Sequence, residues 1–399
     1  MRLLVNFLSR RRLVFVGTVL LAQIQTPLAV SQPPDPVLAH VTTEVEQLTS
    51  QPLDDDAIPR LIEIDESLAE PSSGSTAQTE TQHKILTALA TSQQEAGLAY
   101  VRSVFENAPE RRSSAAAALA AATTLRPTDL QDWTFMVRAL PVVQGDDAVA
   151  ILNALQRFRN RANKGQWVRQ VILVGLQLPS DQQVAATSLL RHWTGIPLKK
   201  SEAVAWTLEK YQEWFSKEYP DQPEPKLPVD SVDRKWTMAT LEKPVHDFVT
   251  TDEMKQLGTR VYEKAGCQKC HRRGKVGEAL GPDLTSLGWR RQRREILLAT
   301  LFPSHELNEE YPTVIVLLKS GKTLTGMMSA SSAEVLAIVS STGIRQEFPR
   351  AEIETIVNQK ISNMPEGLLE TLTRDEIIAL IAWLSSVDGV PRPHTDEGP

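Results

Sequence analysis

Apolar residues recur every three or four positions between about residues 81 and 218, which is the spacing of helices with one buried face. Leu98, Val101 and Phe105 form one such stripe. Prolines and glycines break the pattern into segments that are each about one helix long. The pattern therefore predicts either stacked helical hairpins or an irregular helical bundle.

Two further features refine the first half of the chain. The run Ala115–Ala122 is nearly all alanine, the strongest helix former, and predicts a helix that its neighbours approach closely. Helices of this length with short breaks resemble HEAT-like arrays, so we expect an α-helical HEAT-like domain over residues 81–218. The prolines and acidic residues of 32–80 predict a leader and loop region instead.

The pattern changes after residue 218. Closely spaced prolines predict a stiff, extended linker, which we place over residues 219–249. Alternating apolar positions in 312–357 predict a small β-sheet insert within a C-terminal domain, 250–387. Residues 388–399 form a tail. The expected fold class is mainly α, with the β insert confined to the second domain.

Two predicted helices frame this C-terminal domain. The segment Thr250–Glu253 is a capping box that begins the first helix, and Thr373–Glu376 begins the last. We expect Gly258 on the first helix to meet Trp383 on the last, because only a small residue permits such a close crossing.

Residues 1–31 have the order of a secretory signal peptide. Arginines precede the apolar run Leu13–Ala22, and small residues follow up to Ser31. Polar residues interrupt the run short of the ~20 apolar residues that a spanning helix needs. We expect cleavage after Ser31, export to the periplasm or a similar compartment, and no stable membrane span. A retained anchor is the alternative.

The composition of the chain argues against several classes of function. The chain has 399 residues, of which 41% are hydrophobic, enough to bury the cores of two or three domains. The net charge of −6 argues against a nucleic-acid partner. The presence of only two cysteines excludes a disulfide framework and a zinc site with three or four thiolates.

The candidate chemistry lies in the segment Cys267-Gln268-Lys269-Cys270-His271, which has the C-x-x-C-H spacing of c-type haem attachment. Two thiols one turn apart can each add across a haem vinyl group to give a thioether. The histidine beside the second cysteine then serves as the proximal iron ligand. The motif predicts one covalently bound haem c, and export agrees with it because such haem is attached outside the bacterial cytoplasm.

Three other uses of the cysteines compete with haem attachment. A thioredoxin-like redox pair requires a βαβ setting, whereas this motif follows a predicted helix and precedes a loop rich in glycine and arginine. A zinc site needs more ligands at short spacing. A disulfide across two residues is strained. The sequence favours haem over all three.

An electron-transfer haem usually has a second axial ligand, and several side chains downstream are candidates. Met364 is favoured because Met/His is a common pair in cytochromes c and because Pro365 stiffens its loop. His305 is the alternative. Met327 and Met328 lie in a predicted strand, where packing in a small sheet accounts for them.

The motif, the following Gly281–Thr285 segment and the Met364-Pro365 pair before a last helix together resemble a class I cytochrome c. The insert around Leu317–Gly326 narrows the resemblance to the haem-binding domain family of the Planctomycetes/Verrucomicrobia type, over about residues 250–386. No propeller precedes the domain, so the resemblance does not extend to an attached dehydrogenase. It implies the following roles: Cys267 and Cys270 as thioether attachments, His271 and Met364 as iron ligands, Pro282 as support for the His271 ring, and Arg290 or Arg291 as a propionate contact.

Basic residues cluster around the motif in an otherwise acidic chain. They are Lys269, Arg272, Arg273, Lys275, Arg290, Arg291, Arg293 and Arg294. One interpretation is a docking face for an acidic redox partner protein. The other is a set of solvated loop charges with one or two propionate contacts.

The sequence as a whole favours an exported mono-haem cytochrome that carries single electrons, rather than an enzyme. Two alternatives stay open. One is a haem enzyme or small-molecule sensor with an open axial position. The other is a helical scaffold in which the haem is structural.

Overall fold

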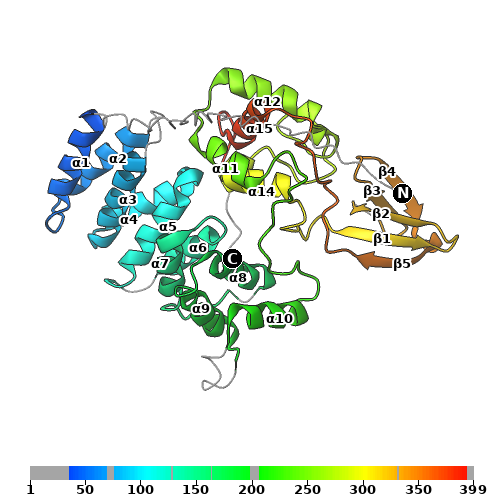
Figure 1. The fold of residues 1–399 in the computed structure, drawn as a ribbon, viewed down its shortest axis with the longest axis horizontal. Coiled ribbons are helices and arrows are strands. Elements are labelled where there is room, and N and C mark those ends of the chain that lie inside the picture. The colour runs from blue at the N-terminus through cyan, green and yellow to red at the C-terminus, as the bar shows by residue number, and fades with distance from the viewer. Residues whose placement is uncertain are drawn as a thin grey trace, which may run out of the picture.

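The computed structural model describes residues 36–69, 76–126, 129–162, 164–197, 206–329 and 332–392. Within these ranges the protein is mainly helical, and a five-stranded antiparallel sheet lies near the C-terminus (Figure 1). The predicted fold class is confirmed at this level. The predicted signal peptide, residues 1–31, lies outside the described residues.

Among the described residues, the first half consists of ten α-helices arranged in sequence along one side of the molecule (Figure 1). They are α1 (Pro36–Leu48), α2 (Ala57–Ala69), α3 (Thr76–Thr91), α4 (Glu95–Asn107), α5 (Arg112–Ala122), α6 (Leu130–Ala139), α7 (Gly145–Leu155), α8 (Gly165–Gln177), α9 (Val184–Thr194) and α10 (Leu208–Glu218).

These helices pack as a stack of hairpins, which we call the helical array. Each helix from α1 to α8 contacts the next along the chain, α10 contacts α8, and α1, α3, α5, α7 and α9 also contact one another in series. The alanine-rich α5 lies at the centre, against α3, α4, α6 and α7, with almost all of its residues buried. The predicted close approach of helices at Ala115–Ala122 is therefore confirmed.

The array begins earlier than the sequence pattern indicates. The segment 32–80, expected to be a leader and loop region, instead contains α1, α2 and the start of α3. Pro36 is the first residue of α1 and Pro59 lies in the first turn of α2. Proline is tolerated in a first helical turn because the amide hydrogen it lacks has no partner there.

Five further α-helices surround a second core. They are α11 (Met238–Asp247), α12 (Asp252–Lys264), α13 (Leu287–Arg290), α14 (Arg293–Leu301) and α15 (Arg374–Ser385). Leu241 and Val245 of α11 are buried in this core, so the last part of the expected linker, 219–249, belongs to the C-terminal region. The Pro-rich segment after α10 forms neither helix nor strand, and it begins with a turn in which the amide of Gln222 donates to the carbonyl of Tyr219.

Helices α12 and α15 cross in close contact. A β-carbon placed on Gly258 of α12 would lie 2.2 Å from the carbonyl oxygen of Ala379 and 2.5 Å from the β-carbon of Trp383. The predicted crossing of Gly258 and Trp383 is confirmed, and only glycine fits there without displacing a backbone.

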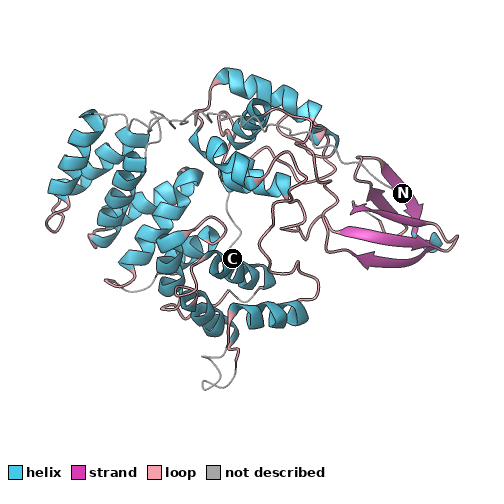
Figure 2. Ribbon diagram, viewed as in Figure 1, coloured by secondary structure: helices cyan, strands magenta, loops and turns pink. Residues whose placement is uncertain are grey.

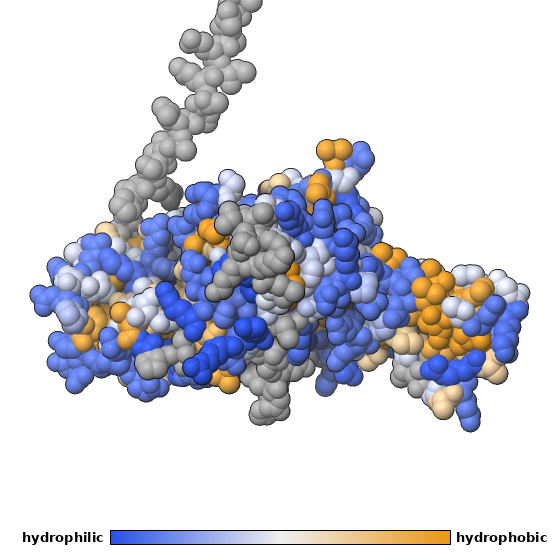
Figure 3. Space-filling view, turned by 90° about the horizontal axis from the view of Figure 1, so that it is seen from below, coloured by the Kyte–Doolittle hydropathy of each residue, from blue (hydrophilic) through white to orange (hydrophobic). Residues whose placement is uncertain are grey.

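The β insert is a separate sheet at one end of the molecule (Figure 2). Its strands are β1 (Thr313–Leu318), β2 (Thr323–Met328), β3 (Val335–Val339), β4 (Arg345–Pro349) and β5 (Ile353–Asn358), in the order β4-β3-β2-β1-β5. Val314, Val316 and Leu336 lie in its small core. Apolar side chains are visible over this end of the molecule (Figure 3).

The helical array and the C-terminal region share a polar contact. Arg112 of α5 is buried and donates hydrogen bonds to the backbone carbonyls of Trp289 and Arg290. The side chain of Gln292 donates to the carbonyl of Pro109 over 2.8 Å. The two halves are therefore joined directly as well as through the linker.

Among the residues that the structure describes, no helix has both the length and the apolar character required to cross a bilayer.

Candidate functional site

The C-x-x-C-H segment follows α12 through a tight turn. Gly266 has a φ of +79°, a conformation that glycine adopts without strain, and it reverses the chain after the helix. Cys267–Lys269 then form a single 3-10 turn, and the amide of His271 donates to the carbonyl of Cys267 over 3.0 Å. This turn brings both cysteines and the histidine to one short stretch of surface.

The two thiols are free and partly buried. Burial raises the pKa of Cys267 to about 11 and also raises the pKa of Cys270, against an opposing effect of Lys269. Both are therefore protonated at neutral pH, whereas a catalytic redox pair depends on a thiolate with a lowered pKa. This environment does not fit a thioredoxin-like site.

The imidazole of His271 is held by its own loop. Its Nδ1–H donates to the carbonyl of Pro282 over 2.8 Å, so Nε2 is the nitrogen left for another partner. Gly281 allows this approach, since a β-carbon there would lie 3.2 Å from Cε1 of the ring. Burial lowers the pKa of His271 despite the opposing hydrogen bond, which favours the neutral ring that binds metals.

The backbone at His271 is fixed from a second direction. The hydroxyl of Tyr262, on α12, donates to the carbonyl of His271 over 2.5 Å. The Tyr262 ring itself packs on Trp383 with a centroid separation of 4.9 Å. The close crossing of α12 and α15 therefore determines where the histidine backbone lies.

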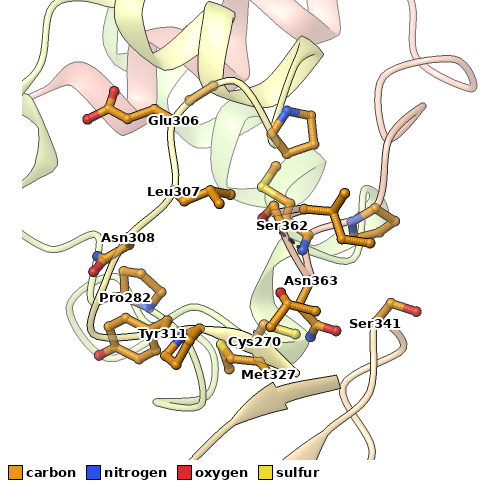
Figure 4. A pocket seen from close by; sticks show the side chains of 18 of the residues that line it. Cys270, Pro282, Glu306, Leu307, Asn308, Tyr311, Met327, Ser341, Ser362 and Asn363 are labelled. Carbon is orange, nitrogen blue, oxygen red and sulfur yellow. Dashed lines mark hydrogen bonds between the residues drawn. The ribbon is translucent and has the colours of Figure 1, made fainter. Parts of the chain in front are cut away.

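A cavity of about 580 Å³ opens beside these groups, within the size range of cofactor sites. Its lining brings together Cys267, Cys270, His271, Pro282 and Met364. Figure 4 shows Cys270 and Met327 on one side of the cavity and Glu306 on the opposite side. The predicted attachment and ligand residues thus meet in one place, although Met364 is far from the motif in sequence.

The loop that carries Met364 is tied down at several points. The amide of Met364 donates to the Ser362 hydroxyl, and the amide of Ser362 donates to the Ser304 hydroxyl, both over 3.1 Å. The side chain of Asn363 donates to the carbonyl of Val339 at the end of β3 over 3.1 Å. The sheet insert therefore helps to fix the position of the thioether.

Other candidate ligands lie differently. Met327 of β2 lines the same cavity and is only 6% exposed. It places a second thioether at the cavity, whereas the sequence predicted that Met327 packs within the sheet. His305 lines a separate pocket of about 410 Å³ instead. The structure therefore leaves Met364 and Met327, and not His305, beside His271.

The propionate contacts implied by the resemblance do not coincide with the cavity. Arg290 and Arg291 are absent from its lining. Arg290 donates to the carbonyl of Asp283, and Arg291 is paired with Glu295 and Glu306. Both side chains are engaged in holding loops, which explains their proximity to the motif without a ligand.

Most of the basic cluster is likewise used inside the protein. Its arginines make these contacts: Arg272 with Asp283, Arg273 over Trp383, Arg293 over Phe248 and Arg294 with Glu242. Lys269 is the member of the cluster that lines the cavity. These contacts within the protein account for the concentration of basic residues near the motif. They weaken the interpretation of the basic cluster as a broad docking face.

Sequence reasoning missed much of the cavity wall. The segments Glu306–Glu309 and Asp221–Pro223 both line it, as do Tyr311 and Ile361. Tyr262 and Leu297 belong to the second core and do not line the cavity. The density of prolines near Asp221 was a signal of fixed backbone, but nothing in the sequence shows which site that backbone faces.

Comparison of the chain with protein-family models and with curated proteins finds no match in either case.

Proposed function

We propose that this protein is an exported mono-haem c-type cytochrome that carries single electrons to or from a redox partner. In this proposal Cys267 and Cys270 would hold the haem through thioethers, and His271 and Met364 would be the protein ligands of its iron. The observation that carries the proposal is the convergence of two thiols, a neutral imidazole and a thioether on one cavity.

The donor set fits a c-type haem in three respects. The thiols are separated by a single 3-10 turn and are free to form two thioethers. The imidazole has one nitrogen fixed by Pro282 and the other available to a metal. The thioether of Met364 is carried by a loop that hydrogen bonds hold in place.

The residues of the chain have distinct tasks in this function. Bound in the cavity, a haem supplies an iron centre that gains and loses one electron. Pro282 and Tyr262 hold the ring and backbone of His271 in place, which limits rearrangement between the two charge states. A thioether ligand and a low local dielectric both favour the reduced state and raise the potential.

The finer fold assignment belongs to the same proposal. We assign residues 250–387 to a class I cytochrome c-like domain with a β insert, and α1 to α10 to a HEAT-like array. The serial packing of alternate helices supports the second assignment. The basic and apolar order of residues 1–31 supports export to the compartment in which such haem is attached.

The redox partner in this proposal is another protein. Lys269, exposed beside the motif and lining the cavity, is the charge best placed to meet an acidic group on that partner. The pairing of the nearby arginines within the protein limits this electrostatic contribution.

A redox titration tests the proposal. The protein is exported in a host that attaches c-type haem, and its visible spectrum is recorded during stepwise reduction, with a pyridine haemochrome assay for the thioethers. We expect one reversible one-electron transition. Ready binding of carbon monoxide to the reduced protein would instead indicate an open axial position, as in a haem enzyme or sensor.

A further inference from the structure

A short part of the linker forms one wall of the cavity. Residues 221–225, which we call the strap, follow α10, and Asp221, Gln222 and Pro223 line the cavity beside Met364. The strap lies on the chain between α10 and α11, which runs from the helical array toward the C-terminal region (Figure 1). The linker that leaves the helical array therefore contributes to the site.

The array holds the strap through its backbone. Arg169 of α8 donates from Nε to the carbonyl of Pro223 over 3.0 Å and from Nη2 to that of Glu224 over 3.3 Å. Gln212 of α10 donates to the carbonyl of Pro225 over 2.7 Å. Three successive carbonyls of the strap are thus bound by side chains of two array helices.

Arg169 is an unusual residue for this task. It is only 6% exposed, and it makes no ion pair among the described residues. Burial lowers its pKa to about 10, which still leaves it charged at neutral pH. A buried guanidinium without a carboxylate partner is costly, so its use on two strap carbonyls indicates that their position matters.

The strap separates two hollows. Pro223 lines both the cavity of about 580 Å³ and the second pocket of about 410 Å³, which Arg169 and Glu224 also line. The side chain of Gln222 donates to Glu309 over 2.8 Å, which joins the strap to the opposite cavity wall. Displacement of the strap would merge the two hollows and admit water to the cavity.

We propose that Arg169 is a positioning residue, by which the helical array holds the strap closed over the haem cavity and excludes small ligands and water from the iron. This inference rests on the proposed haem function, and it gives the array a defined role at the site. The strap acts as a fixed wall whose removal opens a path from the second pocket.

Carbon monoxide is the probe that tests the inference. The reduced Met364→Ala variant provides an accessible iron, and carbon monoxide association is compared with and without Arg169→Met, which keeps an unbranched apolar stem but removes the guanidinium donors. We expect association to become about tenfold faster, as for other loops that gate a site. Arg169→Lys, which restores a charged donor, should recover much of the slower rate.

Arg112→Met, in the same background, is the matched control. Arg112 is also 6% exposed and also donates to backbone carbonyls, but these belong to Trp289 and Arg290 and not to the strap. We expect it to leave association within about twofold. Equal acceleration by both variants, or none with Arg169→Met, would overturn the inference.

A second variant and a second measurement keep the inference testable if Arg169→Met fails to fold or to bind haem. Gln212→Ala removes one strap contact without touching the buried arginine, and it should also accelerate association. Hydrogen exchange over residues 219–228 should be faster in Arg169→Met than in Arg112→Met, even in protein without haem. If the exported protein lacks haem but the two variants still differ in hydrogen exchange, the proposed function is refuted and the anchoring of the strap stands. If the two variants exchange equally fast, the anchoring of the strap is refuted.

Discussion

At the scale of single residues, the position of His271 depends on two hydrogen bonds of different kinds. The carbonyl of Pro282 accepts from the ring, and the hydroxyl of Tyr262 donates to the backbone. The first determines which nitrogen is left for a metal, and the second joins the motif to α12. Neither partner is part of the five-residue motif, so the motif alone does not define the site.

Tyr262→Phe tests the second bond. The variant keeps the buried ring and its packing on Trp383 but removes the hydroxyl. We expect the free energy of unfolding to fall by about 1 kcal/mol, the usual contribution of one hydrogen bond. Urea denaturation measures this change. Tyr311→Phe, which alters a tyrosine elsewhere on the cavity wall, is the control and should be nearly neutral.

Met364 and Met327 form a matched pair for identifying the distal ligand, because both line the cavity. We expect Met364→Ala to abolish the far-red ferric absorption band of methionine ligation and to lower the reduction potential, since a thioether ligand raises it. Met327→Ala should keep the band. Loss of the band in Met327→Ala alone would transfer the ligand role to the sheet insert.

At the scale of secondary-structure elements, capping residues predicted the starts of helices to within one residue, and the alternation of apolar and polar positions predicted the strands. Thr373 caps α15 in the predicted capping box, whereas α12 is capped by Thr251, one residue after the predicted Thr250. The strands fall within 312–357 except that β5 ends one residue later, at Asn358. Prolines were misleading, because Pro36 and Pro59 occupy first turns and Pro244 lies inside α11. A proline fixes the φ angle of its residue to a value found both in the first turn of a helix and in an extended linker. The presence of a proline therefore does not show which of the two structures forms.

Gly258→Ala tests the crossing of α12 and α15. A methyl group would overlap the carbonyl of Ala379, so one helix has to move. We expect a loss of about 3 kcal/mol in the free energy of unfolding, at the upper end of overpacking effects. Glu263→Ala, on an exposed position of the same helix, should change stability by less than about 0.5 kcal/mol. Similar stability of the two variants would contradict the close crossing.

At the scale of the whole molecule, the site is assembled from segments that lie far apart in the chain, from the strap to the loop that carries Met364. The presence of Cys267, Cys270, His271 and Met364 at one cavity agrees with the sequence prediction, which rested on local chemical signals. The strap, the Glu306–Glu309 wall and Met327 were not predicted, because their roles depend on which segments the fold brings together. The contacts that Arg290 and Arg291 make with Asp283, Glu295 and Glu306 were not predicted either, and the propionate role that the resemblance implies for these arginines stays a prediction.

Arg112 offers a test of how the two halves depend on each other. Its removal leaves the carbonyls of Trp289 and Arg290 without their donor in a buried contact. We expect Arg112→Met to cost about 3 kcal/mol, within the range for unsatisfied buried groups. Differential scanning calorimetry should show one transition in both proteins, at a lower temperature in the variant. Two transitions in the parent would show that the halves unfold independently.

The central claim is that a haem is covalently attached at Cys267 and Cys270. Mass spectrometry of the peptide containing residues 267–271, prepared from the exported protein, tests it most directly. The account predicts that this peptide carries the added mass of one haem and that neither cysteine reacts with a thiol reagent. An unmodified peptide with two reactive thiols, from a host that attaches haem to other c-type cytochromes, would contradict it.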